Sequence, residues 1–107
     1  MSPTRGFREY LTERLAEPAQ AAAYLSAALE EYEADDDQQA FLLALRTVVD
    51  ARGGVSELSR RTGLNRQHLY RALSGKGNPT WATMDAILSA LGLRLTIEPR
   101  QQKALPQ

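Results

Sequence analysis

Residues 53–77, GGVSELSRRTGLNRQHLYRALSGKG, read as two short helices joined by a tight turn. The spacing of the apolar residues predicts one helix over about Val55 to Thr62 and a second over Arg66 to Ser74. Gly63, between them, can take the positive φ that a sharp turn requires. Asn65 is a residue type favoured at a helix N-cap. Two helices that cross over a short turn containing glycine form a helix-turn-helix, which indicates binding to DNA.

The second predicted helix separates its side chains into an inward apolar face and polar flanks. Leu69, Ala72 and Leu73 recur at helical spacing and are predicted to face inward. Arg66 and Gln67 stand in the first turn, where Arg can bond bidentately to guanine and Gln to adenine. Any small helical domain can carry solvated charges on its outside. The apolar spacing, the turn glycine, the cap and the Arg-Gln pair nevertheless all agree with one motif.

Composition limits the class of protein. With 107 residues, of which 43% are hydrophobic, the chain can form one domain with a modest core. The absence of cysteine excludes disulfides, thiol catalysis and cysteine-based metal sites, and is compatible with a reducing cytoplasm. No apolar run approaches the roughly 20 residues of a membrane span, and MSPTRGFREY lacks the apolar region of a signal peptide. We therefore expect a cytoplasmic protein that does not enter the membrane.

The charges of the chain are strongly segregated, although its net charge is zero. Residues 1–40 carry three arginines and nine carboxylates, a net charge of −6, and the rest of the chain has a net charge of +6. Such halves indicate two partners, a polyanion for the basic part and a basic protein for the acidic part. The alternative is that the two halves neutralise each other within the fold.

Three amphipathic helices are predicted before the motif. The first covers Phe7 to Leu15. The second begins at Pro18, whose fixed φ suits a first helical position, and covers the Ala-rich residues 18–33. The third covers residues 38–51 and is predicted to be the most buried. Because carboxylates oppose the dipole at a helix C-terminus, Asp35 to Asp37 either cap the third helix or serve a partner.

A further helix and a strand are predicted after the motif. Thr80 can cap a helix over Trp81 to Leu91, and Trp81 belongs to its inward apolar stripe. Leu93 to Ile97 alternate apolar and polar residues, as a half-buried strand does. A solitary strand leaves its backbone unpaired, so a second subunit or an edge in another protein would have to pair with it. The last ten residues, 98–107, are polar with two prolines and are predicted to be disordered.

The predicted fold is all-α, a helix-turn-helix bundle with an N-terminal helical extension and a short C-terminal β-strand. Residues 1–37 form the acidic extension, residues 38–97 the helix-turn-helix domain and residues 98–107 the tail.

Taken together, these stretches resemble the HigA-like addiction-module antidote proteins, a branch of the lambda-repressor-like helix-turn-helix proteins. The resemblance rests on EYL and LAEP near the start, AAAYLSAALEE, FLLALRTVVDARGG, TGLNRQHLYRALSGKGNPT and the closing ALGLRL. It covers roughly residues 9–97, and the pieces are specific as a set. The chain departs from the expected pattern at Gly75 and Lys76, where a more acidic or polar pair is expected.

The resemblance implies an antitoxin that neutralises a small basic toxin of the RelE-like or HigB-like ribonuclease type. It also implies a homodimer that represses its own operon at a palindromic operator. The implied base-reading residues are Arg66, Gln67 and Arg71, with Asn65, Tyr70 and Ser74 near the groove. The implied phosphate contacts are Arg60, Lys76 and Asn78. The toxin contact is expected in the acidic N-terminal extension, since a ribonuclease toxin needs a basic surface to hold RNA.

Other classes of function fit less well. We predict no enzyme and no cofactor, because His68 is the single histidine and no catalytic triad or metal-ligand spacing is present. A magnesium site at Asp35 to Asp37 is disfavoured, because consecutive residues at a helix start point in different directions. The remaining alternatives are a stand-alone phage-type repressor without a toxin and a protein-interaction module that has lost DNA binding. Arg66, Gln67 and Arg71 count against the second of these.

Overall fold

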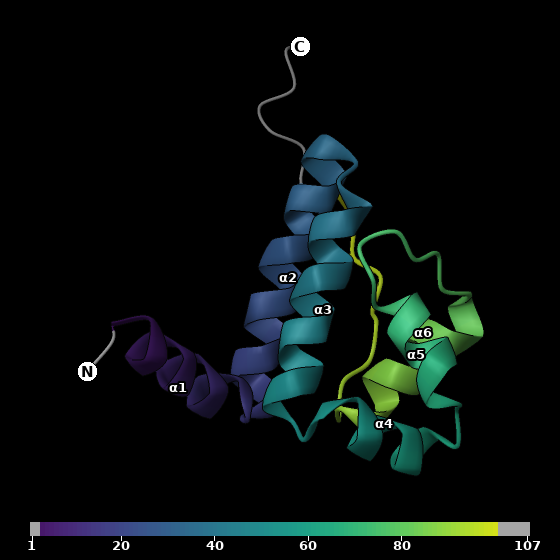
Figure 1. Cartoon of the computed structure of the whole chain (residues 1–107). Coiled ribbons are helices and arrows are strands. Elements are labelled where there is room, and N and C mark those ends of the chain that lie inside the picture. The colour runs from purple at the N-terminus through teal and green to yellow at the C-terminus, as the bar shows by residue number, and fades with distance from the viewer. Residues whose placement is uncertain (1–2, 101–107) are drawn as a thin grey trace.

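The computed structural model describes residues 3–100, with side chains from residue 6 onward, and within this range it contains six helices and no strand. The helices are α1 (Pro3–Leu15), α2 (Pro18–Asp35), α3 (Gln38–Ala51), α4 (Gly54–Thr62), α5 (Arg66–Ala72) and α6 (Trp81–Ala90). The two longest, α2 and α3, lie side by side, and the short helices α4 to α6 gather on one flank of the pair (Figure 1). The prediction of an all-α fold is therefore confirmed for the described residues. No helix among them is both long and apolar enough to cross a bilayer.

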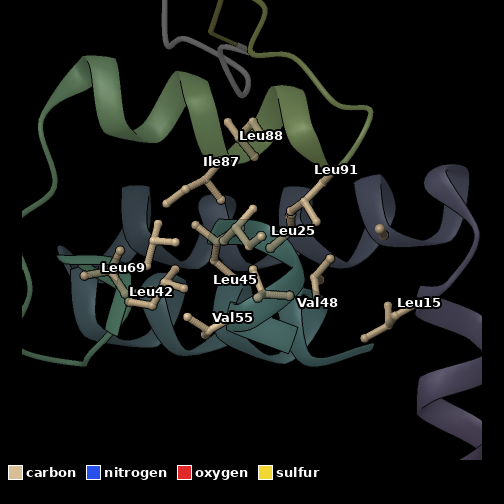
Figure 2. Packing of buried hydrophobic residues seen from close by; sticks show 14 of the residues in the cluster. Leu15, Leu25, Leu42, Leu45, Val48, Val55, Leu69, Ile87, Leu88 and Leu91 are labelled. Atoms are coloured by element: carbon tan, nitrogen blue, oxygen red, sulfur yellow. The ribbon is translucent and has the colours of Figure 1, made fainter. Parts of the chain in front are cut away.

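The core is centred on α3, which was predicted to be the most buried helix. Leu42, Leu45, Val48 and Val49 of α3 are almost completely buried. They are covered by apolar side chains from the other five helices, among them Leu15, Leu25, Val55, Leu58, Leu69, Ile87 and Leu88. Figure 2 shows Ile87 pointing from α6 toward the side chains that α3 contributes. Full burial of one such side chain contributes about 2 kcal/mol to the stability of the fold. Because helices on both sides bury side chains against α3, this helix joins the acidic N-terminal helices to the basic C-terminal ones.

The acidic turn between α2 and α3 is built by the aspartates themselves. Asp36 adopts the left-handed conformation at φ 56°, which aspartate tolerates better than most residues, and its N–H donates to the carbonyl oxygen of Tyr32 at 2.6 Å. Asp37 is the N-cap of α3, and its Oδ1 accepts from the N–H of Ala40 at 3.1 Å. One of the two roles considered for the aspartates, capping of the next helix, is thus confirmed for Asp37.

The connection between α4 and α5 is three residues long. Gly63 lies at φ 76° and Asn65 caps α5, accepting from the N–H of His68 at 3.1 Å. Both features were predicted. α5 ends at Ala72, two residues before the predicted end at Ser74. Beyond the helix the backbone tightens, because the N–H of Ser74 donates to the carbonyl oxygen of Arg71 at 3.3 Å, and Ser74 Oγ donates to the same oxygen at 2.9 Å.

The predicted strand over Leu93 to Ile97 is absent from the described chain. Gly92, at φ 78°, follows the end of α6, and the N–H of Leu93 then turns back to the carbonyl oxygen of Leu88 at 2.8 Å. Leu93 packs against the core, whereas Leu95 is 40% and Ile97 99% exposed. The strand prediction was wrong because no other edge in the described chain offers backbone partners to this segment. Residues 98–100 carry no regular structure, and the rest of the predicted tail, 101–107, lies outside the described residues.

The position of Trp81 also differs from the prediction. Its side chain is 74% exposed instead of facing inward, whereas Thr80 caps α6 as predicted, accepting from the N–H of Thr83 at 3.1 Å. Trp81 shares its helical stripe with Ile87 and Leu88, but it is the first residue of α6 and lies beyond the edge of the core. Helical periodicity predicts the face on which a side chain lies and not whether a neighbour covers that face.

Candidate nucleic-acid interface

The outer face of α5 is polar and open to solvent. Arg66, Gln67, Tyr70 and Arg71 are all exposed, whereas Leu69 on the opposite face is completely buried. Within the described chain, no ion pair engages Arg66 or Arg71. Because Asn65 fixes the start of the helix, the polar side chains of its first turn project from a rigid position. Such a face can present hydrogen-bond donors to a large anionic surface.

Arg66 and Arg60 are both oriented by α4. The Nη1 atom of Arg66 donates to Ser56 Oγ at 3.2 Å. Arg60 forms a bidentate pair with Glu57, with Nε to Oε1 at 3.0 Å and Nη2 to Oε2 at 2.5 Å. Arg61 Nε reaches the same Oε2 atom at 2.9 Å. The guanidinium group of Arg60 is therefore partly compensated, although its side chain is 71% exposed.

Arg60 and Arg61 determine the ionisation state of Glu57. The hydrogen bonds from Arg60 and then Arg61 lower the pKa of Glu57 to about 2, and their positive charges act in the same direction. Glu57 is consequently ionised over the whole physiological pH range. The outer face of α4 thus carries two guanidinium groups and one carboxylate, a net positive charge beside α5.

Tyr70 leans toward α3 instead of pointing straight outward. The guanidinium carbon of Arg46 lies 5.2 Å from the centroid of its ring, and Arg46 Nε is bonded to Asp50 Oδ1 at 2.9 Å. Arg46 was not assigned to the site from the sequence. It stands on a different helix, and no local spacing signal relates it to Tyr70.

Four of the nine predicted residues line one open groove between the end of α5 and the start of α6. They are Arg71, Ser74, Lys76 and Asn78, and the groove is completed by His68, Ala72, Gly77, Pro79 and Thr80. The other five, Arg60, Asn65, Arg66, Gln67 and Tyr70, do not line it and lie on α4, α5 and the turn between them. The structure therefore places the predicted residues in two adjoining parts, the outer face of α5 and this basic groove.

The sequence analysis gave His68 no role in the site and gave Thr80 only that of a helix cap. His68 Nε2 lies 3.2 Å from Thr83 Oγ1, and Thr83 Oγ1 in turn accepts from Thr80 Oγ1 at 3.1 Å. This chain of hydrogen bonds joins α5 to the start of α6, and its two ends, His68 and Thr80, line the groove. No local spacing signal relates His68 to Thr83, because the two residues belong to different helices.

The loop that carries Lys76 and Asn78 is held tightly in place. The N–H of Gly77 donates to the carbonyl oxygen of Ser74 at 2.9 Å. A Cβ at Gly77 would lie 2.6 Å from the carbonyl oxygen of Ala72, closer than real Cβ atoms approach, so the loop can only pass here as glycine. A Cβ at Gly75 would similarly come within 2.7 Å of Gln39 Cγ. The exposed side chain of Gln39 can shift, so this contact alone does not require glycine at position 75.

Two comparisons with known proteins each match most of the chain. Residues 7–99 match the model of a family described as "Probable addiction module antidote protein". An uncharacterized protein of Haemophilus influenzae is 35% identical over 88 residues, which are 82% of this chain and 86% of that protein. No solved structure matches the chain. The matched residues contain α2 to α6 entirely and most of α1, so the chain belongs to the family of addiction-module antidote proteins.

Proposed function

We propose that this protein is the antitoxin of a type II toxin-antitoxin system, which binds its operator DNA through a helix-turn-helix formed by α4 and α5 and neutralises a toxin by direct binding. The observation that carries the DNA-binding half is the exposed polar face of α5, preceded by a three-residue turn with Gly63 at positive φ and a side-chain cap at Asn65. The toxin half rests on family membership, since an antidote implies a toxin of some kind.

In this proposal α5 lies in the major groove, which is about 12 Å wide and admits one helix. Gln67 and Arg71 read base edges, and Arg66 does so after releasing Ser56. Arg60, Lys76 and Asn78 contact phosphates on either side of the reading helix, so they set affinity and its dependence on salt without reading sequence. The arrangement of basic groove and helix face in one continuous region supports these roles.

The proposed operator is palindromic and is bound by a homodimer. Two copies related by a twofold axis present two reading helices about 34 Å apart, which is one turn of DNA. Leu95 and Ile97 are apolar side chains exposed after the last helix, and a contact with a second copy would remove them from water. A dimer is the state in which the proposed helix-turn-helix of α4 and α5 can read both half-sites.

The proposed toxin is a small basic protein of the RelE-like or HigB-like ribonuclease type. The first forty residues carry a net charge of −6, which is complementary to a surface that binds RNA. The antitoxin itself acts by binding, without catalysis, in the cytoplasm where its operator lies.

The proposal is tested by expressing the chain together with the protein encoded by the adjoining reading frame, purifying through a tag on one of them, and titrating the product onto the intervening promoter DNA. A stoichiometric complex that binds the promoter supports both halves of the proposal. Promoter binding without a protein partner would leave a stand-alone repressor. A protein complex that does not bind the promoter would leave a protein-interaction module.

A further inference from the structure

A second groove lies on the other side of the loop at residues 78 and 79, and it is apolar. Leu29 and Tyr32 of α2, Phe41 of α3 and Met84 of α6 line it, together with Pro79. Its volume is about 190 Å³, below the roughly 300–1,000 Å³ of sites that enclose small-molecule ligands. The groove therefore suits one or two apolar side chains of a protein better than a cofactor or metabolite.

The surface beside this groove is strongly acidic. Six carboxylates stand at the end of α2 and in the turn to α3, namely Glu30, Glu31, Glu33, Asp35, Asp36 and Asp37. Asp37 caps α3, and within the described chain no ion pair engages any of the six. Because the sequence contains no Lys or Arg between Arg14 and Arg46, their charges are not compensated by basic neighbours along the chain.

We propose that this groove is the docking site for a basic amphipathic segment of the toxin. One apolar side chain of the segment is seated between Tyr32 and Met84, and flanking Lys or Arg residues face the carboxylates of Glu33 and Asp35. This proposal rests on the proposed antitoxin function. The apolar anchor supplies most of the affinity, and the charges supply specificity and fast association.

The negative charge beside this groove excludes DNA and a second copy of the chain as its occupants. DNA would be repelled by six carboxylates. A second copy in a twofold contact would bring the same acidic surface against itself, which costs free energy because like charges then face each other. A basic segment of another protein is the occupant that matches both the apolar floor and the acidic rim.

The test measures the Kd between the chain and the protein encoded by the adjoining reading frame by titration calorimetry at low and moderate salt. Tyr32→Ala removes part of the groove wall and is expected to raise Kd at least tenfold. Glu33→Gln with Asp35→Asn is expected to raise Kd severalfold and to flatten its dependence on salt. Tyr10→Ala and the pair Glu13→Gln with Glu17→Gln remove one aromatic ring and two carboxylate charges at the opposite end of α2, and are expected to leave Kd within twofold.

Promoter binding and thermal unfolding of each variant show that it is folded, because the DNA face does not include Tyr32. A wild-type chain that does not bind the adjoining product contradicts the antitoxin function itself. If both groove variants bind the adjoining product with the Kd of the wild type, only the assignment of the toxin contact to this groove is contradicted. An equal loss in the control variants places the contact elsewhere. A change of oligomeric mass in Tyr32→Ala would contradict the proposal by assigning the groove to a second copy of the chain. Tighter toxin binding by a chain ending at Arg100 would contradict it by assigning the groove to residues 101–107.

Discussion

Gln38, at the start of α3, donates a hydrogen bond from Nε2 to the carbonyl oxygen of Gly77 at 3.0 Å, across 39 positions of sequence. This contact joins the acidic end of the helical pair to the loop that carries Lys76 and Asn78. Asn78 and Pro79 line both the basic groove and the apolar groove, so one short loop forms a wall of each. The geometry of this loop is therefore central to the proposed DNA contact.

Gly77→Ala is expected to destabilise the protein and to weaken its binding to DNA. The added Cβ would collide with backbone oxygens of Arg71 and Ala72, which cannot move as a side chain can, and such overpacking costs about 1–3 kcal/mol. In a domain of this size the melting temperature should fall by several degrees, as circular dichroism would show. Gly6→Ala is the control, because its Cβ meets nothing within 4 Å inside α1, and it should be neutral or slightly stabilising.

Glu57 is expected to make part of the stability of the folded protein depend on pH. Its pKa is lowered to about 2 in the folded chain, from a usual value near 4.5, so its contribution is present above pH 4.5 and is lost as the pH falls toward 2. The difference in melting temperature between wild type and Glu57→Gln should accordingly be constant above pH 5 and vanish toward pH 2. The difference will be small, because the pair is exposed to solvent. A difference that persists unchanged at pH 2 would contradict the ion pairs.

Arg60→Ala is expected to weaken binding to all DNA sequences by a similar factor. If Arg60 contacts one phosphate, its removal lowers the slope of log K against log salt by about one unit. Fluorescence anisotropy over a series of salt concentrations measures this slope. Arg8→Ala removes an equal charge from α1, outside the proposed interface, and should leave the slope unchanged. An unaltered slope in Arg60→Ala would remove this residue from the phosphate contacts.

Ile97→Asp is expected to weaken the proposed homodimer. Ile97 is 99% exposed in the single chain, so the substitution should not disturb the fold, whereas in a dimer contact it would bury an unpaired carboxylate. Analytical ultracentrifugation should show a shift from dimer to monomer at a concentration where the wild type is dimeric. Thr96→Ser provides the control for a change at the neighbouring position. A dimer of undiminished stability in Ile97→Asp would place the subunit contact elsewhere.

The features that could be predicted from the sequence are those decided by neighbours in the chain. The cap at Asn65, the turn at Gly63 and the start of α2 at Pro18 depend on one residue and the next few backbone groups, and all three are present. The exposure of Trp81 and the absence of a strand at Leu93 to Ile97 depend on what lies beside them in space. Periodicity alone carries no information about such neighbours.

The candidate site shows the same division. The polar face of α5 was predictable, because helical spacing separates Gln67 and Arg71 from Leu69. The stacking of Arg46 on Tyr70 and the hydrogen bond between His68 and Thr83 were not, since each joins residues of two helices. The apolar groove was missed for the same reason, because three helices and a loop contribute its lining.

Whether α5 reads operator DNA is tested by comparing the binding of wild type and Gln67→Ala to the promoter sequence and to random DNA of equal length at one salt concentration. Gln67 is exposed in the first turn of α5, where a bidentate contact with adenine is worth about 1–3 kcal/mol of discrimination. The predicted result is a loss of about five- to 150-fold in affinity for the promoter and little change on random DNA. Equal losses on both, or no loss on either, would contradict a base-reading role for α5.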